Sequence, residues 1–169
     1  MKNSASSKND LLDEIISFIE EIGISIRFQD VTDSTFLPGI MIDGGTMIID
    51  REKLAFPGDV LHEAGHIALT PAHERHLLAG DLDAGKNEAN SLEMAAICWS
   101  YAAALHLNID LNLLFHEEGY KGESAWLIKT FEEGNYLGLP LLQWMELCTR
   151  QDDTSDTPPF PYMIKWLRD

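Results

Sequence analysis

The sequence has few basic residues for its many acidic ones. It holds 12 Lys and Arg against 28 Asp and Glu, which gives a formal net charge of −16. Such a charge repels the phosphates of nucleic acids and the surface of anionic membranes, and no local cluster of Lys and Arg reverses it. We therefore expect neither nucleic acid nor a membrane as a partner.

Long apolar segments and closely spaced cysteines are also missing. No stretch approaches the roughly 18 consecutive apolar residues that a membrane-spanning helix needs. The opening letters, MKNSASSKND, contain no apolar core of a secretory signal. Cys98 and Cys148 lie far apart within apolar helical patterns, which favours reduced, buried thiols over a disulfide. The sequence thus predicts a cytoplasmic protein.

The rest of the composition is that of a folded protein. With 169 residues, 45% of them hydrophobic, the chain can bury a core without disulfides. We expect one domain over residues 1–150. Residues 151–169 begin as a linker rich in Asp, Thr and Pro and end in YMIKWL, a segment apolar enough to dock back on the same domain.

Helical periodicity dominates the chain, with short β-branched runs near the N-terminus. The fold class is therefore α+β, mainly helical with a small mixed or antiparallel sheet. Asn9 or Asp10 is expected to cap the first helix and Gly23 to end it. Helices are expected over residues 11–23, 59–70, 88–107, 110–116, 123–134 and 139–148, and strands over 24–29, 39–45 and 46–52, with a hairpin at the letters DGG.

Residues 61–70, LHEAGHIALT, hold two of the six histidines and a glutamate within five positions. The segment is expected to be helical until Pro71 ends it, and residues four apart lie on one face of a helix. His62 and His66 can therefore direct two imidazoles at one point, a geometry that suits Zn²⁺. The HExxH pattern assigns Glu63 as the general base that takes a proton from water. A helix with two hydrogen-bonded structural histidines is the alternative.

A third zinc ligand has to come from outside this turn. The metzincin pattern would require Gly at position 69 and His at position 72, where this chain has Leu69 and Ala72. The other source is the next long helix, on which Glu88 and Glu93 point about 140° apart. Glu93 heads a face of small side chains that can pack closely, whereas Glu88 suits the helix N-terminus without any metal. We expect Glu93 as the ligand, with Glu88 in reserve.

The letters HEAGHIALT, followed after a loop by NEANSLEMAA, resemble the ImmA/IrrE-type metallopeptidases, a zincin-like family. The resemblance covers roughly residues 10–105 and extends to the order of helix, small sheet, HExxH helix and glutamate helix. It implies a zincin-like fold in which His62, His66 and a glutamate of the second helix hold one zinc ion while Glu63 activates water. If the letters EAN align without a gap, Glu88 is the ligand, so both glutamates stay open.

These features predict a zinc metallopeptidase, a hydrolase that acts on a peptide or protein substrate. Zinc would polarise the scissile carbonyl and lower the pKa of a water molecule towards about 7. Glu63 would take the proton of that water and pass it to the departing amine. The alternative from another class is a non-catalytic, zincin-like metal-binding protein with a regulatory or interaction role.

Further parts of such a site are expected at less specific positions. Residues 46–52 are the candidate edge strand that would hold an extended substrate by strand addition. Residues 73–87 join the two ligand helices and are a candidate lid. The four tryptophans are expected as core anchors. Candidates for the group that stabilises the oxyanion are Tyr101, Tyr120, Tyr136, His73, His76 and His116.

Overall fold

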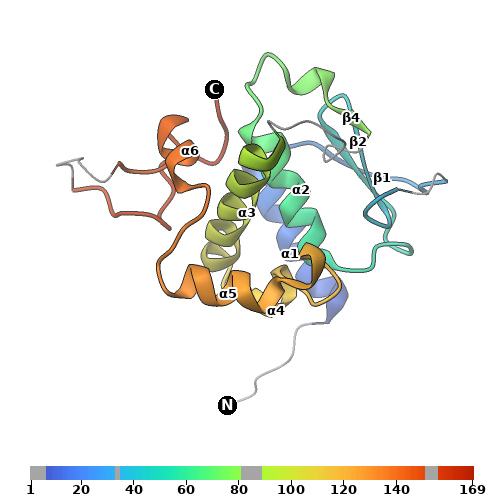
Figure 1. The fold of residues 1–169 in the computed structure, drawn as a ribbon. Helices are drawn as coiled ribbons and strands as arrows, with labels where there is room; N and C mark the ends of the chain where they lie inside the picture. The colour runs from blue at the N-terminus through green and yellow to red at the C-terminus, as the bar shows by residue number, and fades with distance from the viewer. Residues whose placement is uncertain (1–6, 33–34, 81–88, 151–155) are drawn as a thin grey trace.

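Helices and a small sheet make up residues 7–32, 35–80, 89–150 and 156–169, the part of the chain that the computed structural model describes (Figure 1). The fold is α+β with a small mixed sheet, as the sequence predicted. The described elements are α1 (Lys8–Glu21), β1 (Ile26–Phe28), β2 (Ile40–Asp43), β3 (Thr46–Ile49), α2 (Pro57–Leu69), the 3₁₀ turn η1 (Arg75–Leu77), β4 (Ala79–Gly80), α3 (Ala89–His106), α4 (Leu111–Leu114), the 3₁₀ turn η2 (Tyr120–Gly122), α5 (Ser124–Glu132) and α6 (Leu139–Trp144).

The ends of α1 follow from local hydrogen bonding. Ser7 is the N-cap, so the prediction of Asn9 or Asp10 was wrong by two or three residues. The Ser7 hydroxyl accepts a hydrogen bond from the Asp10 N–H at 3.2 Å, and the Asp10 carboxylate accepts one from the Ser7 N–H at 3.0 Å. This reciprocal pair is a capping box. Gly23 follows the helix with a φ of 101°, a left-handed conformation that favours glycine and ends the helix as predicted.

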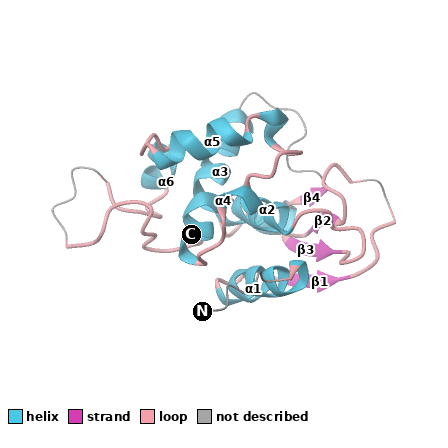
Figure 2. Cartoon of the chain, turned by 90° about the horizontal axis from the view of Figure 1, so that it is seen from below, coloured by secondary structure: helices cyan, strands magenta, loops and turns pink. Residues whose placement is uncertain are grey.

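The sheet has the strand order β1-β3-β2-β4 (Figure 2). β2 and β3 form the predicted antiparallel hairpin around Gly44 and Gly45, whose φ angles of 58° and 76° suit a two-residue turn. β1 pairs with β3 in parallel, and β4 pairs with β2. β3 therefore has a partner on each side, and the prediction that residues 46–52 form a substrate-binding edge is wrong. Among the described strands, the edges are β1 and β4.

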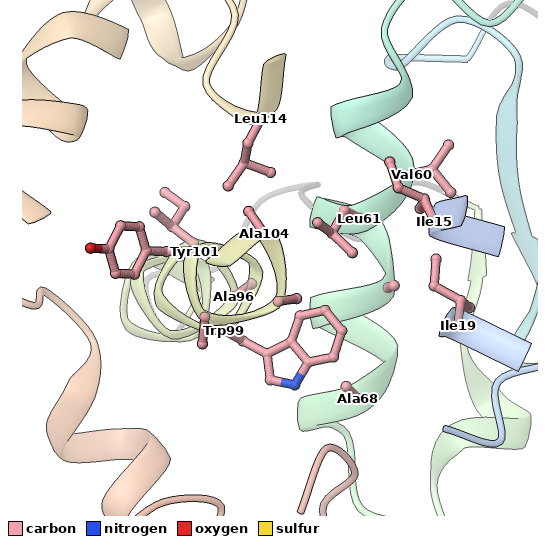
Figure 3. Close-up of a cluster of buried hydrophobic side chains, with 14 of the residues drawn as sticks. Ile15, Ile19, Val60, Leu61, Ala68, Ala96, Trp99, Tyr101, Ala104 and Leu114 are labelled. Carbon is pink, nitrogen blue, oxygen red and sulfur yellow. The ribbon is translucent and has the colours of Figure 1, made fainter. Parts of the chain in front are cut away.

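α2 lies in the centre of the core, with α1 on one side and α3 on the other (Figure 3). Val60 points towards Ile15 and Ile19 of α1, whereas Leu61 points towards α3 (Figure 3). Every residue of α2 except His66 is buried. This helix is apolar on two faces because it fills the space between two other helices. α4 and α5 lie across one end of α2 and α3 (Figures 1 and 2).

The C-terminal residues pack against the helices that form the core. The Trp166 ring lies edge-on to Phe18 and to Trp99, with centroid distances of 5.0 and 5.5 Å. The Trp99 indole N–H donates to the Trp166 carbonyl at 3.0 Å, and the Arg168 N–H donates to the Ala68 carbonyl at 2.9 Å. The last bond satisfies a carbonyl at the C-terminal end of α2, where no intrahelical donor is left.

The tryptophans and cysteines divide between core and surface. Trp99 is fully buried, but Trp126 and Trp144 are 52% and 62% exposed, so the expectation of four core tryptophans is wrong for these two. Each lies on a short helix at the surface that buries few of its side chains. Both cysteines are buried as free thiols, and burial raises the pKa of Cys148 to about 11.

None of the helices in the described ranges combines the length and the apolar character that crossing a membrane requires.

Candidate metal centre

α2 brings His62 and His66 together on one face. Pro57 occupies the first turn, where its missing N–H leaves no bond unmade, and the helix runs to Leu69. The two histidines are one turn apart, and their Nε2 atoms lie 3.2 Å from each other. Their rings are nearly perpendicular, with an interplanar angle of 88°. Two imidazole nitrogens thus meet at one point, as the spacing predicted.

Glu93 of α3 completes this group. Its Oε1 lies 3.3 Å from His62 Nε2, and its Oε2 lies 3.0 Å from His66 Nε2. The side chain is on the part of α3 that faces α2, one turn inside the described start of the helix. The structure therefore places Glu93 where the small-residue face of α3 suggested. Glu88, the reserve candidate, lies outside the described residues.

The spacing of these three side chains depends on a close approach of α2 and α3. A Cβ added to Gly65 would lie 3.1 Å from the Ala96 carbonyl oxygen and 3.2 Å from the Trp99 ring. These separations are shorter than ordinary van der Waals contact, so a side chain at this position would force α2 and α3 to move apart by a few tenths of an ångström. Gly65 stands between the two histidines in sequence, and the contact holds Glu93 at the height of both imidazoles.

The donor set fits a zinc ion. Zn²⁺ binds imidazole nitrogen and carboxylate oxygen at about 2.0–2.2 Å, and a tetrahedral arrangement then separates neighbouring ligand atoms by about 3.3 Å. The separation of 3.2 Å between the two Nε2 atoms agrees with that value, and each imidazole nitrogen has one Glu93 oxygen at a similar distance, Oε1 at 3.3 Å from His62 and Oε2 at 3.0 Å from His66. Side chains of two histidines and one glutamate are also the ligands that catalytic zinc sites use, in which water takes the fourth position.

The protonation state of Glu93 suits the same role. Burial alone would raise the pKa of its carboxyl, but hydrogen bonds from His62 and His66 lower it well below the ordinary range. Glu93 is thus a carboxylate at neutral pH. Metal ligands have to be deprotonated, so this group is ready to bind a cation without first losing a proton.

Glu63 lies beside the same imidazoles. A carboxylate oxygen of Glu63 and the ring nitrogens of His62 and His66 all lie within 4.8 Å of one another. The side chain is only 6% exposed. Glu63 and Glu93 therefore both lie close to the two imidazoles, Glu63 from α2 and Glu93 from α3. This placement suits a base that acts on a neighbouring water molecule.

A second buried pair lies next to this group. His116 Nε2 is 2.9 Å from Asp59 Oδ1, and both residues are buried. The His116 ring is stacked on Phe56 at 3.7 Å, and its centroid is 6.3 Å from that of Tyr120. The Tyr120 ring in turn lies edge-on to His62, with a centroid distance of 5.8 Å. Aromatic contacts therefore link the Asp59–His116 pair to His62, one of the candidate ligands.

The other candidates for oxyanion stabilisation lie elsewhere. Tyr101 packs against Phe131 and Tyr136, and it points away from α2 (Figure 3). His73 and His76 are both exposed, and the Nε2 atom of His73 lies 3.3 Å from the Oε1 atom of its neighbour Glu74. The candidate lid, residues 73–87, is described only as far as Gly80, and this part contains η1 and β4 rather than an unstructured loop.

Asp59 was not predicted as a functional residue. Its spacing in the sequence could have indicated it, because Asp59 precedes His62 by three positions and Glu63 by four. It therefore shares their face of α2. Its partner His116 is 57 positions away, and that pairing had no local sign in the sequence. In the comparisons with known proteins, neither a family model, nor a curated protein, nor a solved structure matches this chain.

Proposed function

We propose that this chain is a zinc-dependent peptidase with a zincin-like fold of the ImmA/IrrE type. The observation that carries the proposal is the convergence of His62, His66 and Glu93 from two helices. The two Nε2 atoms are 3.2 Å apart, and each has a different Glu93 oxygen within 3.3 Å. The position of Glu63 beside the same imidazoles gives the group a base as well as ligands. A purely structural histidine pair would need neither the second helix nor a second carboxylate.

His62, His66 and Glu93 would hold the ion, and Glu63 would handle the proton. Zinc, when bound, polarises a carbonyl oxygen and lowers the pKa of water to about 7. Glu63 accepts a proton from the attacking water while the water oxygen forms a bond with the scissile carbonyl carbon. It then delivers that proton to the amide nitrogen as the C–N bond breaks. The low exposure of Glu63 keeps bulk water from competing for this proton.

The proposal is tested with protein purified without a histidine tag. Elemental analysis should find one zinc per chain, and the zinc-loaded protein should cleave members of a proteome-derived peptide library, read by mass spectrometry. Glu63→Gln should keep the zinc and lower the rate of cleavage by about 10²–10⁴-fold, the usual contribution of a general base. Unchanged cleavage by this variant would show that Glu63 is not the base.

Glu20→Gln is the matched control, because it makes the same chemical change on the exposed face of α1. It should leave both zinc content and cleavage unchanged. A wild-type protein that binds zinc but cleaves no peptide of the library would instead support a non-catalytic metal-binding protein. Absence of zinc would reject both functions.

A further inference from the structure

A pocket of about 430 Å³ lies between the C-terminal ends of α1 and α3 and residues 165–169. Its wall includes His106 at the end of α3, whereas Glu93 lies near the start of that helix, so about 20 Å of helix separates the two. A volume of this size is typical of sites that bind small molecules. The pocket is therefore a candidate for a second site with a ligand of its own.

One wall of the pocket is aromatic. Phe18 of α1, His106 of α3 and Trp166 line it together. Their ring centroids are 5.0 to 5.6 Å apart, and the rings meet at angles between 45° and 89°, so they form a continuous wall that is curved rather than flat. Aromatic faces carry a partial negative charge and attract cations, and the face of Trp does so most strongly. This wall thus favours a ligand with an apolar body that carries positive charge.

The charge around the pocket is negative. The C-terminal end of a helix carries a partial negative charge, and two such ends, those of α1 and α3, border the pocket. Glu21 adds a carboxylate at the end of α1. Lys165 also lines the pocket, but its ammonium group pairs with the Asp169 carboxylate, which compensates its charge. The electrostatic field in the pocket therefore favours a cation.

Glu21 opposes the electrostatics of its own helix. A glutamate is unfavourable at the C-terminal end of a helix, where a lysine or an arginine is favourable. The last turn of α1 contains no basic residue, and among the described residues no Lys or Arg forms an ion pair with Glu21. A positively charged ligand would compensate both the carboxylate and the helix end.

We propose that this pocket binds a small organic ammonium ion, in which a positively charged nitrogen, such as a quaternary ammonium group, is attached to an apolar body. The apolar body lies against Phe18 and Trp166, and the charged nitrogen lies near Glu21. An anion would be repelled by the carboxylate and the helix ends, and an uncharged apolar molecule would leave the carboxylate uncompensated. A metal ion such as Mg²⁺ gives up its water reluctantly and prefers oxygen ligands, so it gains little from the aromatic wall. The proposal does not depend on the metal centre or on its function.

The probes are choline and its uncharged analogue 3,3-dimethyl-1-butanol, in which carbon replaces the quaternary nitrogen. Each is titrated into the full chain labelled with ¹⁵N, at about pH 7.5, where an ordinary imidazole is mostly neutral, and in about 0.15 M salt, which screens distant charges. The chemical shifts of the Trp166 indole N–H and the Ile22 amide report binding in the pocket. Choline should bind with a Kd about tenfold lower than the alcohol, because only choline is charged. No saturable shift with choline, or equal Kd values for the two probes, would overturn the proposal.

Glu21→Gln tests the role of the carboxylate, with Glu20→Gln as the matched control. Each variant loses one negative charge from the net −16, but Glu20 lies outside the lining of the pocket. Glu21→Gln should weaken choline binding about five- to tenfold and leave binding of the alcohol unchanged, whereas Glu20→Gln should change neither. Equal choline Kd values for the two variants would show that the protein attracts the cation only through its overall charge, and would overturn the proposal.

Trp166→Leu tests the aromatic wall, because leucine keeps an apolar side chain and removes the face of the ring. Followed through the Ile22 amide, it should weaken binding of choline more than binding of the alcohol. Trp126→Leu, at an exposed tryptophan outside the pocket, should change neither. Equal losses for the two probes in Trp166→Leu would overturn the role of the ring in binding the cation.

Zinc separates this proposal from the proposed function. Zinc-loaded protein and protein treated with a chelator should bind choline with the same Kd, because His62, His66 and Glu93 lie outside the lining of the pocket. Shifts centred on the two histidines instead of on the pocket would show that the metal centre holds choline, and would overturn the proposal. Failure to cleave any peptide would reject the peptidase and leave this binding site standing.

Discussion

Gly65 of α2 lies against the backbone of Ala96 in α3, so closely that an added Cβ would be only 3.1 Å from the Ala96 carbonyl oxygen. The contact is next to His66 on α2 and faces the turn after Glu93 on α3. Its length therefore sets how far the Glu93 carboxylate lies from the imidazoles. The separations of 3.0–3.3 Å at the proposed metal centre exist because the two helix backbones can approach each other at this residue.

Gly65→Ala is expected to weaken both zinc binding and folding. The added methyl group would push α3 away from α2, and overpacking of this kind lowers the free energy of unfolding by about 1–3 kcal/mol. Zinc affinity, measured by competition with a chromophoric chelator, should fall as well. Gly134→Ala is the control: it introduces strain at a φ of 81° with no atom nearby, so it should lower stability and leave zinc affinity unchanged.

Substitutions of Glu93 and Glu88 are expected to differ sharply in their effect on zinc affinity. Glu93→Gln removes the carboxylate that lies 3.0 Å from His66, and a ligand lost from a three-residue site should lower zinc affinity by at least about 10²-fold. Glu88→Gln should leave it unchanged. Chelator competition on both variants measures this directly. The reverse order of the two affinities would assign the ligand to Glu88.

The features that could be predicted from the sequence are those set by neighbours in the chain. His62, Glu63 and His66 lie on one helix, and their proximity follows from a spacing of one turn. The hairpin at Gly44 and Gly45 follows in the same way from a two-residue turn that glycine favours. In each case the interacting residues are so close in sequence that local backbone geometry alone decides the outcome.

The features that were missed depend on segments far apart in the chain. β3 became an interior strand because β1 pairs with it in parallel across about twenty residues, and no turn signal announces such a pairing. Asp59 and His116 meet because α4 packs against α2. The choice between Glu93 and Glu88 depends on how α3 crosses α2, which the small side chains on the face of Glu93 indicated only in part.

Asp50 is expected to make the stability of the fold depend on acid pH. Its carboxylate accepts a hydrogen bond from the Val31 N–H at 3.0 Å, and this bond, opposed by burial and aided by the N–H groups of Lys53 and Glu52, lowers the pKa of Asp50 below 3.8. Since the pKa is lower in the folded state, the stabilisation is complete above the unfolded value and disappears as the pH falls through the folded one.

Asp50→Asn should therefore be less stable than the wild type at neutral pH. It should also lose less stability than the wild type on going from pH 5 to pH 2, as measured by urea unfolding at each pH. Asp43→Asn serves as the control, because the Asp43 side chain is 64% exposed and its ion pair with Arg27 lies at the surface. Parallel pH profiles for Asp50→Asn and the wild type would contradict the prediction.

Trp166, whose partly exposed ring covers buried side chains, is expected to stabilise the core. Its ring contacts both Phe18 and Trp99, so Trp166→Ala would uncover the indole of a fully buried tryptophan. Full burial of Trp is worth about 3–5 kcal/mol against Ala, and for this partly exposed ring we expect a loss of about 2 kcal/mol in the free energy of unfolding. Trp126→Ala, at a residue that is 52% exposed, should cost less than about 1 kcal/mol.

Zinc affinity should be the same in both variants, because the C-terminal segment contacts the end of α2 beyond His66. Equal unfolding midpoints for the two variants would show that the C-terminal segment contributes nothing to the stability of the core.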